Sequence, residues 1–149
     1  MTSPASASVL RIERLIAAPP DRVFAAWIDP DLVALWMSPV GLATAEVEPW
    51  VGGRLRVTMI GGDVRIEHRG EYREIVPNRC LVFTWQSPYT GPDPSLVTVR
   101  LEPSGTGTMV SLIHERLPHD HVESHRNGWG SMLDRLAGLL ATVRNHGGR

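Results

Sequence analysis

A single long amphipathic segment near the C-terminus limits the architectures open to this chain. From residue 120 to about residue 144, apolar side chains recur at helical spacing and form one stripe. Asp120 and Glu123, three residues apart, resemble a capping box with Asp in place of the usual Ser or Thr. The segment is therefore predicted to be a helix with one buried face. The stripe consists of Trp129, Met132, Leu133, Leu136, Leu139, Leu140 and Val143.

The sequence before this helix is mainly typical of short strands. Residues 9–17 alternate well enough for a first strand, and Pro19-Pro20 ends that strand and starts a helix. Two short helices are predicted, one that includes residues 23–28 and one over residues 31–37. Alternating segments bounded by glycine and proline turns then predict six further strands. These strands cover residues 43–50, 54–60, 64–76, 79–86, 96–101 and 108–116.

Consecutive strands joined by short turns form an antiparallel meander with one buried face. The C-terminal helix is the element long enough to cover that face, so the chain is predicted to be an α+β protein. A sheet of about six or seven strands has to curve around one helix, and Gly70 is a place where it can bend. A curved sheet and a straight helix rarely fill the space between them, so a ligand-sized cavity is expected there.

Composition and charge exclude several classes of partner. The 149 residues fit one domain, predicted over residues 9–146 after a disordered N-terminal tail of residues 1–8. The net charge of -1 gives no basic footprint for nucleic acid, and no apolar run is long enough for membrane insertion. With one cysteine and no secretory signal, the protein is expected to be cytoplasmic, as a monomer or homodimer.

Several short motifs, in their order and spacing, resemble those of one family. They cover about residues 9–143, and the chain resembles the bacterial relatives of the C-terminal domain of the activator of heat-shock protein 90 ATPase. That family lies within the START/birch-pollen-allergen (SRPBCC) superfamily. The matching motifs are Ala18-Pro19, residues 23–27 (VFAAW), Asp29-Pro30, Leu35-Trp36, residues 52–55 (GGRL), Gly70-Glu71-Tyr72, Glu74-Ile75, residues 81–85 (LVFTW), and Gly128-Trp129 with Leu133 and Leu136.

The resemblance implies the helix-grip fold, with two short helices after the first strand and a hydrophobic pocket under the C-terminal helix. It does not imply one activity, because relatives include lipid carriers, polyketide cyclases and hormone sensors. The co-chaperone itself carries an additional N-terminal domain that this sequence lacks. Direct stimulation of a chaperone ATPase is therefore not expected.

Twelve residues on the inner faces are candidates for contact with a ligand in the cavity. Polar groups are costly to bury unless they are paired, so the three polar candidates either orient a ligand or form a structural hydrogen-bond network. Arg14 also lies on an apolar side, and pairing of the first and last strands would place it near His114. The candidates are Trp36, Met59, His68, Tyr72, Phe83, Trp85, Val99, Leu101, His114, Trp129, Met132 and Leu133.

A metal site and a catalytic centre receive less support from the sequence. His119, His121 and His125 invite a metal-binding interpretation, but a solvated helix start explains them better, and the zinc-protease motif is missing. No metal or other cofactor is predicted. No nucleophile elbow or phosphate-binding loop occurs, so no catalytic residue is assigned. His68 or Tyr72 could still act as a general acid or base on a bound substrate.

The sequence supports three hypotheses of function. The leading one is non-enzymatic binding or carriage of an apolar or aromatic small molecule in the cavity. The second is a cyclase- or aromatase-like enzyme that uses the same pocket. The third is a co-chaperone-like protein-interaction module on the outer sheet face, where charged residues leave little sign of an apolar patch. The loop over residues 87–94, with Tyr89 among prolines, could gate the pocket or contact a partner.

Overall fold

The chain forms one strand, two short helices, six further strands and a long final helix. The computed structural model describes residues 8–39 and 41–147, with side chains up to residue 141. This order confirms the predicted α+β class. The elements are β1 (Ser8–Ile16), α1 (Pro20–Ile28), α2 (Pro30–Trp36), β2 (Leu42–Val47), β3 (Arg54–Gly61), β4 (Val64–Val76), β5 (Cys80–Trp85), β6 (Ser95–Ser104), β7 (Gly107–Leu117), a 3-10 helix (His119–His121) and α3 (Val122–Gly147).

The two short helices begin where the sequence signals predict. Pro20 and Pro30 occupy the first helical turn, where the missing N–H of proline costs no intrahelical hydrogen bond. The side chain of Asp29 accepts a hydrogen bond from the backbone N–H of Asp31 (2.9 Å) and so caps α2. The apolar face of α1, which includes Phe24 and Trp27, is buried.

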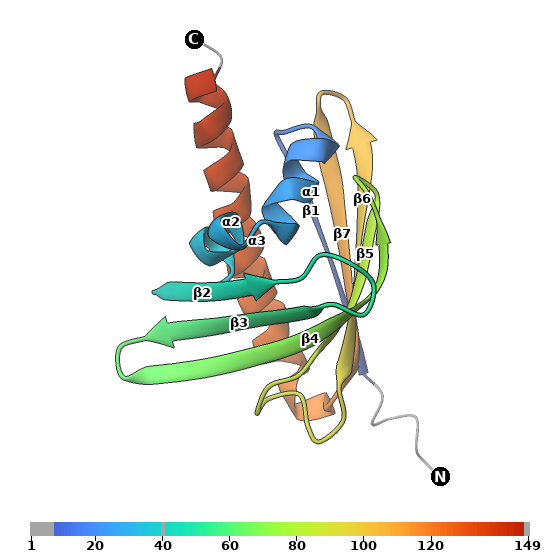
Figure 1. Cartoon of the computed structure of the whole chain (residues 1–149), viewed down its shortest axis with the longest axis vertical. Coiled ribbons are helices and arrows are strands. Elements are labelled where there is room, and N and C mark those ends of the chain that lie inside the picture. The colour runs from blue at the N-terminus through green and yellow to red at the C-terminus, as the bar shows by residue number, and fades with distance from the viewer. Residues whose placement is uncertain (1–7, 40, 148–149) are drawn as a thin grey trace.

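All seven strands belong to one antiparallel sheet in the order β1-β7-β6-β5-β4-β3-β2. Figure 1 shows β2, β3 and β4 running crosswise to β1, β5, β6 and β7, with α3 passing behind the crossing strands. The sheet therefore curves around the helix. This is the helix-grip fold that the resemblance implies.

Strand β4 carries the change of direction within the sheet. It pairs with β3 up to Glu71 and with β5 from Tyr72 onward, and the register with β5 shifts between Tyr72 and Glu74. A Cβ atom on Gly70 would come within 2.0 Å of the carbonyl oxygen of Thr84 on β5. A residue without a side chain is therefore needed where the two halves of the sheet meet.

The core lies between the concave face of the sheet and the three helices. A chain of ring contacts crosses it, from Trp36 to Trp27 (4.7 Å between centroids), from Trp27 to Trp129 (6.1 Å) and from Trp129 to Trp85 (5.6 Å). Burial of side chains of this size stabilises the fold by roughly 1.5–3 kcal/mol each. The three helices and β5 are thus joined through tryptophan side chains.

Two details differ from the expectations. The final helix begins at Val122, and Asp120 lies in the preceding 3-10 helix, so the capping box expected of Asp120 and Glu123 is wrong. Such 3-10 turns are common at helix ends, and here the backbone N–H of His121 donates to the carbonyl of Pro118 (2.9 Å). Residues 1–7 of the expected tail lie outside the described residues, and Ser8 already belongs to β1.

Within the described part of the chain, no helix is long and apolar enough to cross a bilayer.

Candidate ligand-binding pocket

A pocket of about 240 Å³ opens between α3 and the strands β3, β4 and β5. Its base is formed by the buried residues His68, Trp85, Trp129 and Met132, and its rim by residues that are exposed or partly exposed. None of the lining residues carries a carboxylate, guanidinium or ammonium group. The complete lining is Pro39, Met59, Ile66, His68, Trp85, Tyr89, Ser124, His125, Gly128, Trp129 and Met132.

Aromatic rings form the base of the pocket. The imidazole of His68 stacks on the indole of Trp85, with 4.8 Å between centroids and 27° between planes. Trp85 in turn lies 5.6 Å from Trp129, which α3 projects toward the sheet. The alternation of β4 and β5 turns His68 and Trp85 inward, and the helical period of α3 brings Trp129 and Met132 to the same side.

His68 has an unusual hydrogen-bonding state. Only 7% of this residue is exposed, yet its Nδ1 has no hydrogen-bond partner in the protein. Burial, with a smaller contribution from His125, lowers the pKa of His68 to about 4, although nearby backbone groups of Ile66 and Val57 partly offset this shift. The imidazole is therefore neutral at physiological pH, and its Nδ1 is enclosed by the protein.

His114 lies beside the pocket in a complete hydrogen-bond chain. The indole N–H of Trp129 donates to Nδ1 of His114 (3.0 Å), and the hydroxyl of Ser95 donates to the carbonyl of Trp85. The remaining contact, between Nε2 of His114 and Oγ of Ser95 (2.7 Å), must then be donated by the imidazole. His114 is fully buried, and burial lowers its pKa well below the usual value. This chain fixes the orientation of Trp129 in the pocket.

The rim of the pocket joins the loop after β5 to the start of α3. The Tyr89 ring lies 5.8 Å from the His121 ring in an edge-on contact. The hydroxyl of Ser87 accepts from the backbone N–H of Tyr89, and that of Thr90 accepts from the backbone N–H of Ser87 (both 3.0 Å). His125 donates from Nδ1 to the carbonyl of His121 (2.8 Å), which leaves its Nε2 as an acceptor.

Of the twelve candidate residues, the structure brings five together in the pocket: Met59, His68, Trp85, Trp129 and Met132. His114 contacts the pocket through Trp129. The hydroxyl of Tyr72 is buried without a partner, its ring packs edge-on against Phe83 (6.0 Å), and burial raises its pKa. The others belong to the packed core and do not line the pocket: Trp36, Phe83, Val99, Leu101 and Leu133.

Arg14 lies elsewhere than the polar group in which it was expected. Its guanidinium forms an ion pair with Asp134 (2.8 Å) on α3, and its Cα pairs with Val110 of β7, whereas His114 pairs with Leu10. The Arg14 side chain therefore contacts α3 and does not line the pocket. Of His119, His121 and His125, His125 lines the pocket, and the described residues hold no group of three His, Cys, Asp or Glu suited to a metal ion.

Sequence reasoning missed the lining residues Pro39, Ile66, Ser124 and Gly128. Of these four, Gly128 could have been noticed in the sequence. A glycine inside a helix lowers its stability, and nothing in the local sequence explains a glycine directly before the buried Trp129. A Cβ atom at Gly128 would meet no other atom within 4 Å. The glycine therefore leaves space at the side of the pocket.

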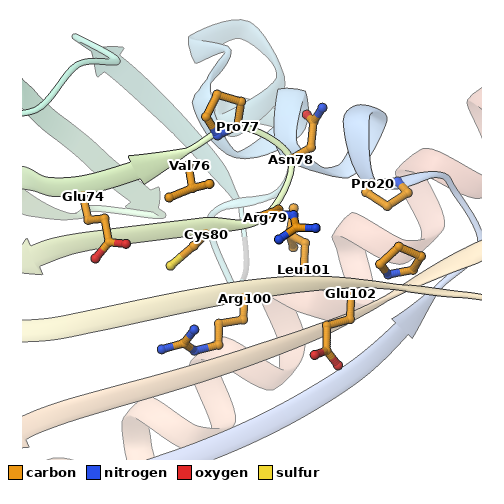
Figure 2. Close-up of a pocket in the computed structure, with 11 residues that line it drawn as sticks. Pro20, Glu74, Val76, Pro77, Asn78, Arg79, Cys80, Arg100, Leu101 and Glu102 are labelled. Atoms are coloured by element: carbon orange, nitrogen blue, oxygen red, sulfur yellow. The ribbon is translucent and has the colours of Figure 1, made fainter.

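A larger hollow, of about 830 Å³, lies on the outer side of the sheet around the turn between β4 and β5. Figure 2 shows Glu74, Cys80, Arg100 and Glu102 pointing to the same side of the strands, with Pro77 and Asn78 at the turn. Charged groups of both signs surround this hollow. Burial, with Glu74 nearby, raises the pKa of the Cys80 thiol, which makes it a poor nucleophile. The smaller apolar pocket is therefore the better candidate site.

Solved structures of bacterial proteins share this fold. Protein CV1439 from Chromobacterium violaceum is 28% identical, with a TM-score of 0.80 over 89% of this chain and 96% of that one. Protein Mll3558 from Rhizobium loti is 29% identical, with a TM-score of 0.74 over the same shares. Protein NE0264 from Nitrosomonas europaea shares the fold at 18% identity, with a TM-score of 0.79 over 97% of this chain and 99% of that one.

Among curated proteins, no sequence matches this chain. Residues 17–141 match the family described as activator of Hsp90 ATPase homolog 1-like protein. The match runs from the residue after β1 to residue 141 in α3, the last residue whose side chain the structure describes. It includes every residue that lines the pocket. The chain therefore belongs to the activator of Hsp90 ATPase homolog 1-like family.

Proposed function

We propose that the protein binds a small apolar or aromatic molecule in the pocket between α3 and the sheet. The observation that carries this proposal is the aromatic base formed by Trp85 and Trp129, reached through a rim without charged side chains. Small-molecule sites are commonly concave, mostly apolar and supplied with a few polar groups. This pocket has that composition, with His68, His125 and Ser124 as its polar members.

The volume of the pocket favours a small ligand. A cavity of about 150 Å³ lined by apolar side chains is enough to bind benzene. The volume of about 240 Å³ therefore suits a molecule of one or two rings more than a long lipid chain. Gly128 contributes to this volume, since a side chain at that position would project into open space.

Toluene is a suitable first probe, followed through the fluorescence of tryptophan excited at 295 nm. We expect saturable binding that Gly128→Leu weakens at least tenfold by filling the pocket. The matched control is Gly138→Leu, which makes the same change on an exposed position of α3 where a Cβ also meets no other atom. Absence of saturable binding by the unmodified protein, or equal weakening by both substitutions, would overturn the proposal.

A second candidate is acid–base catalysis on a molecule held in the same pocket. The observation that favours it is the neutral His68 imidazole at the base of the pocket, with His125 close enough to lower its pKa further. A positioned imidazole is sufficient for general acid–base catalysis. Enzyme function predicts turnover that His68→Phe abolishes while toluene binding persists, whereas a carrier shows no turnover in either protein.

A further inference from the structure

The imidazole of His125 lines the pocket with its two nitrogens in different states. Its Nδ1 lies 2.8 Å from the carbonyl oxygen of His121, one turn earlier in the chain. A carbonyl oxygen only accepts, so Nδ1 carries the proton and Nε2 of the neutral ring is an acceptor. Burial lowers the pKa of His125, which favours this neutral ring. The hydrogen-bonding role of Nε2 is therefore fixed by the backbone.

Nε2 of His125 is open to a hydrogen bond from a ligand. Within the described residues, the bond from Nδ1 is the one hydrogen bond of this ring. Three side-chain polar atoms of the described residues are enclosed without a partner, and Nε2 of His125 is not among them. This nitrogen therefore has neither a partner nor a complete cover of protein atoms. Because Nδ1 points back to the turn that precedes α3, Nε2 points away from the helix backbone.

The position of His125 on α3 places this acceptor next to the aromatic base of the pocket. Its ring lies 5.1 Å from the ring of His114, a buried residue of β7, so it is on the side of α3 that faces the sheet. Trp129 follows four residues later, on the same face of the helix and about 6 Å along its axis. A flat ring that lies against Trp129 and Trp85 can therefore bring its edge to His125.

The remaining lining restricts the group that this acceptor can meet. No Asp, Glu, Arg or Lys lines the pocket, so a charged ligand would lose its hydration without gaining an opposite charge. The hydroxyl of Ser124 also donates to the carbonyl of His121 (3.1 Å), which leaves its oxygen as a second acceptor at the rim. An ether or carbonyl oxygen of a ligand would here meet an acceptor. The group that fits is an uncharged N–H or O–H donor.

We infer that the pocket selects an uncharged aromatic molecule of one or two rings with an N–H or O–H donor at its edge, and that Nε2 of His125 accepts this hydrogen bond. The inference rests on the proposed function and adds to it the class of the ligand's polar group and the residue that recognises it. It goes beyond a general affinity for aromatic rings, because molecules of the same shape that lack the donor should bind more weakly.

The test compares indole, benzofuran and indene, bicyclic molecules of nearly equal size that carry N–H, oxygen or a methylene group at the same ring position. Binding to isotope-labelled protein is followed by NMR through the indole N–H signals of its five tryptophans, of which Trp85 and Trp129 line the pocket. We expect indole to bind about five- to tenfold more tightly than benzofuran or indene, in keeping with one net hydrogen bond. Indole should also shift the nitrogen signal of His125 Nε2 much more than indene does.

His125→Phe supplies the matched variant, because phenylalanine keeps a ring at this position and removes both nitrogens. In this variant the three molecules should bind with equal affinity, and a preference for indole that survives the substitution overturns the inference. Equal binding of the three to the unmodified protein also overturns it and leaves the proposed function standing. If the variant does not fold, the Nε2 signal of the unmodified protein decides, since an equal response to indole and indene overturns the inference. Failure of all three molecules to bind overturns the proposed function itself.

Discussion

His68 and His114 are both buried on the inner face of the sheet, but the protein satisfies them differently. Both ring nitrogens of His114 have partners, through Trp129 and Ser95, whereas Nδ1 of His68 has none. An unpaired buried polar group costs about 1–3 kcal/mol of stability. His114 therefore supports the fold, and His68 is tolerated by the fold at some cost. Stability sacrificed in a pocket is a common sign of function.

Substitution by phenylalanine should separate these two roles. His114→Phe should lower the free energy of unfolding by about 2–4 kcal/mol, because Trp129 Nε1 and Ser95 lose their buried partner. His68→Phe should change it by less than about 1 kcal/mol or raise it, since an unpaired nitrogen is removed and the ring stack on Trp85 is kept. Denaturant unfolding of the three proteins at pH 7.5 measures both effects.

The decisive quantity is the difference in free energy of unfolding between the two variants, because each introduces the same ring at a buried position. A loss of stability in His68→Phe as large as that in His114→Phe would show that His68 has a structural partner. A small loss in His114→Phe would show that its hydrogen-bond chain contributes little. Either result would contradict the division of roles drawn from the two rings.

Among the secondary structure elements, β4 has the most demanding position, because it belongs to both halves of the curved sheet. Gly70→Ala should destabilise the protein by at least about 2 kcal/mol, since the new Cβ would overlap the carbonyl oxygen of Thr84, a backbone atom that cannot move aside cheaply. The same overlap should push β5 outward and loosen the stack of Trp85 on His68. Denaturant unfolding measures the first effect and near-ultraviolet circular dichroism the second.

A glycine in a turn provides the control for this substitution. Gly62 has a φ of 61°, in the left-handed region, and a Cβ there would meet no atom within 4 Å. Asn tolerates this backbone conformation, so Gly62→Asn should change stability by less than about 1 kcal/mol. If Gly70→Ala proved as mild as Gly62→Asn, the close approach of β4 and β5 would not be what requires glycine.

The elements could be predicted from the sequence because each is encoded by a local pattern. The strand predicted over residues 64–76 coincides with β4, and the predicted final helix differs from α3 by a few residues at each end. Alternation and helical spacing report which side of an element is buried. Proline and glycine report where it stops. These signals need no knowledge of distant residues.

The pocket could be predicted only in part. Hydrophobic periodicity indicates which face of a strand or helix is buried, but it does not indicate where along that element a pocket opens. Trp85 and Val99 both point inward from neighbouring strands, but only Trp85 lies at the end of the sheet where the pocket opens. Tyr89 reaches the rim through a loop whose course depends on hydrogen bonds of Ser87 and Thr90. Gly128 reveals its role only when the space beside it is known.

At the scale of the whole molecule, the curvature of the sheet gathers three histidines in one apolar region. Burial lowers the pKa values of His68, His114 and His125, and in each case a neighbouring histidine lowers it further. Rings of His114 and His125 lie 5.1 Å apart. The folded protein therefore resists protonation at three sites that an unfolded chain would protonate freely, with a pKa near 6.5 for each.

The sign of the resulting pH dependence follows from proton binding. Between about pH 6.5 and pH 4, the unfolded chain binds more protons than the folded protein, so stability rises with pH. The histidine contribution is complete above about pH 7 and is lost as the pH falls through 6.5 toward 4. Each fully unprotonated histidine adds a slope of about 1.4 kcal/mol per pH unit, and the half-buried His125 adds less.

Denaturant unfolding between pH 7.5 and pH 4.5 should therefore show a steep decline in the free energy of unfolding, equivalent to two or three protons taken up. Glu67, whose pKa is lowered through its hydrogen bond with Arg69, acts with the same sign but below about pH 4.5, outside this window. In His68→Phe the slope should fall by about one proton, because that variant has one fewer group to protonate on unfolding. An unchanged slope would mean that His68 takes up its proton in the folded protein as readily as in the unfolded chain, and burial would then not keep its imidazole neutral.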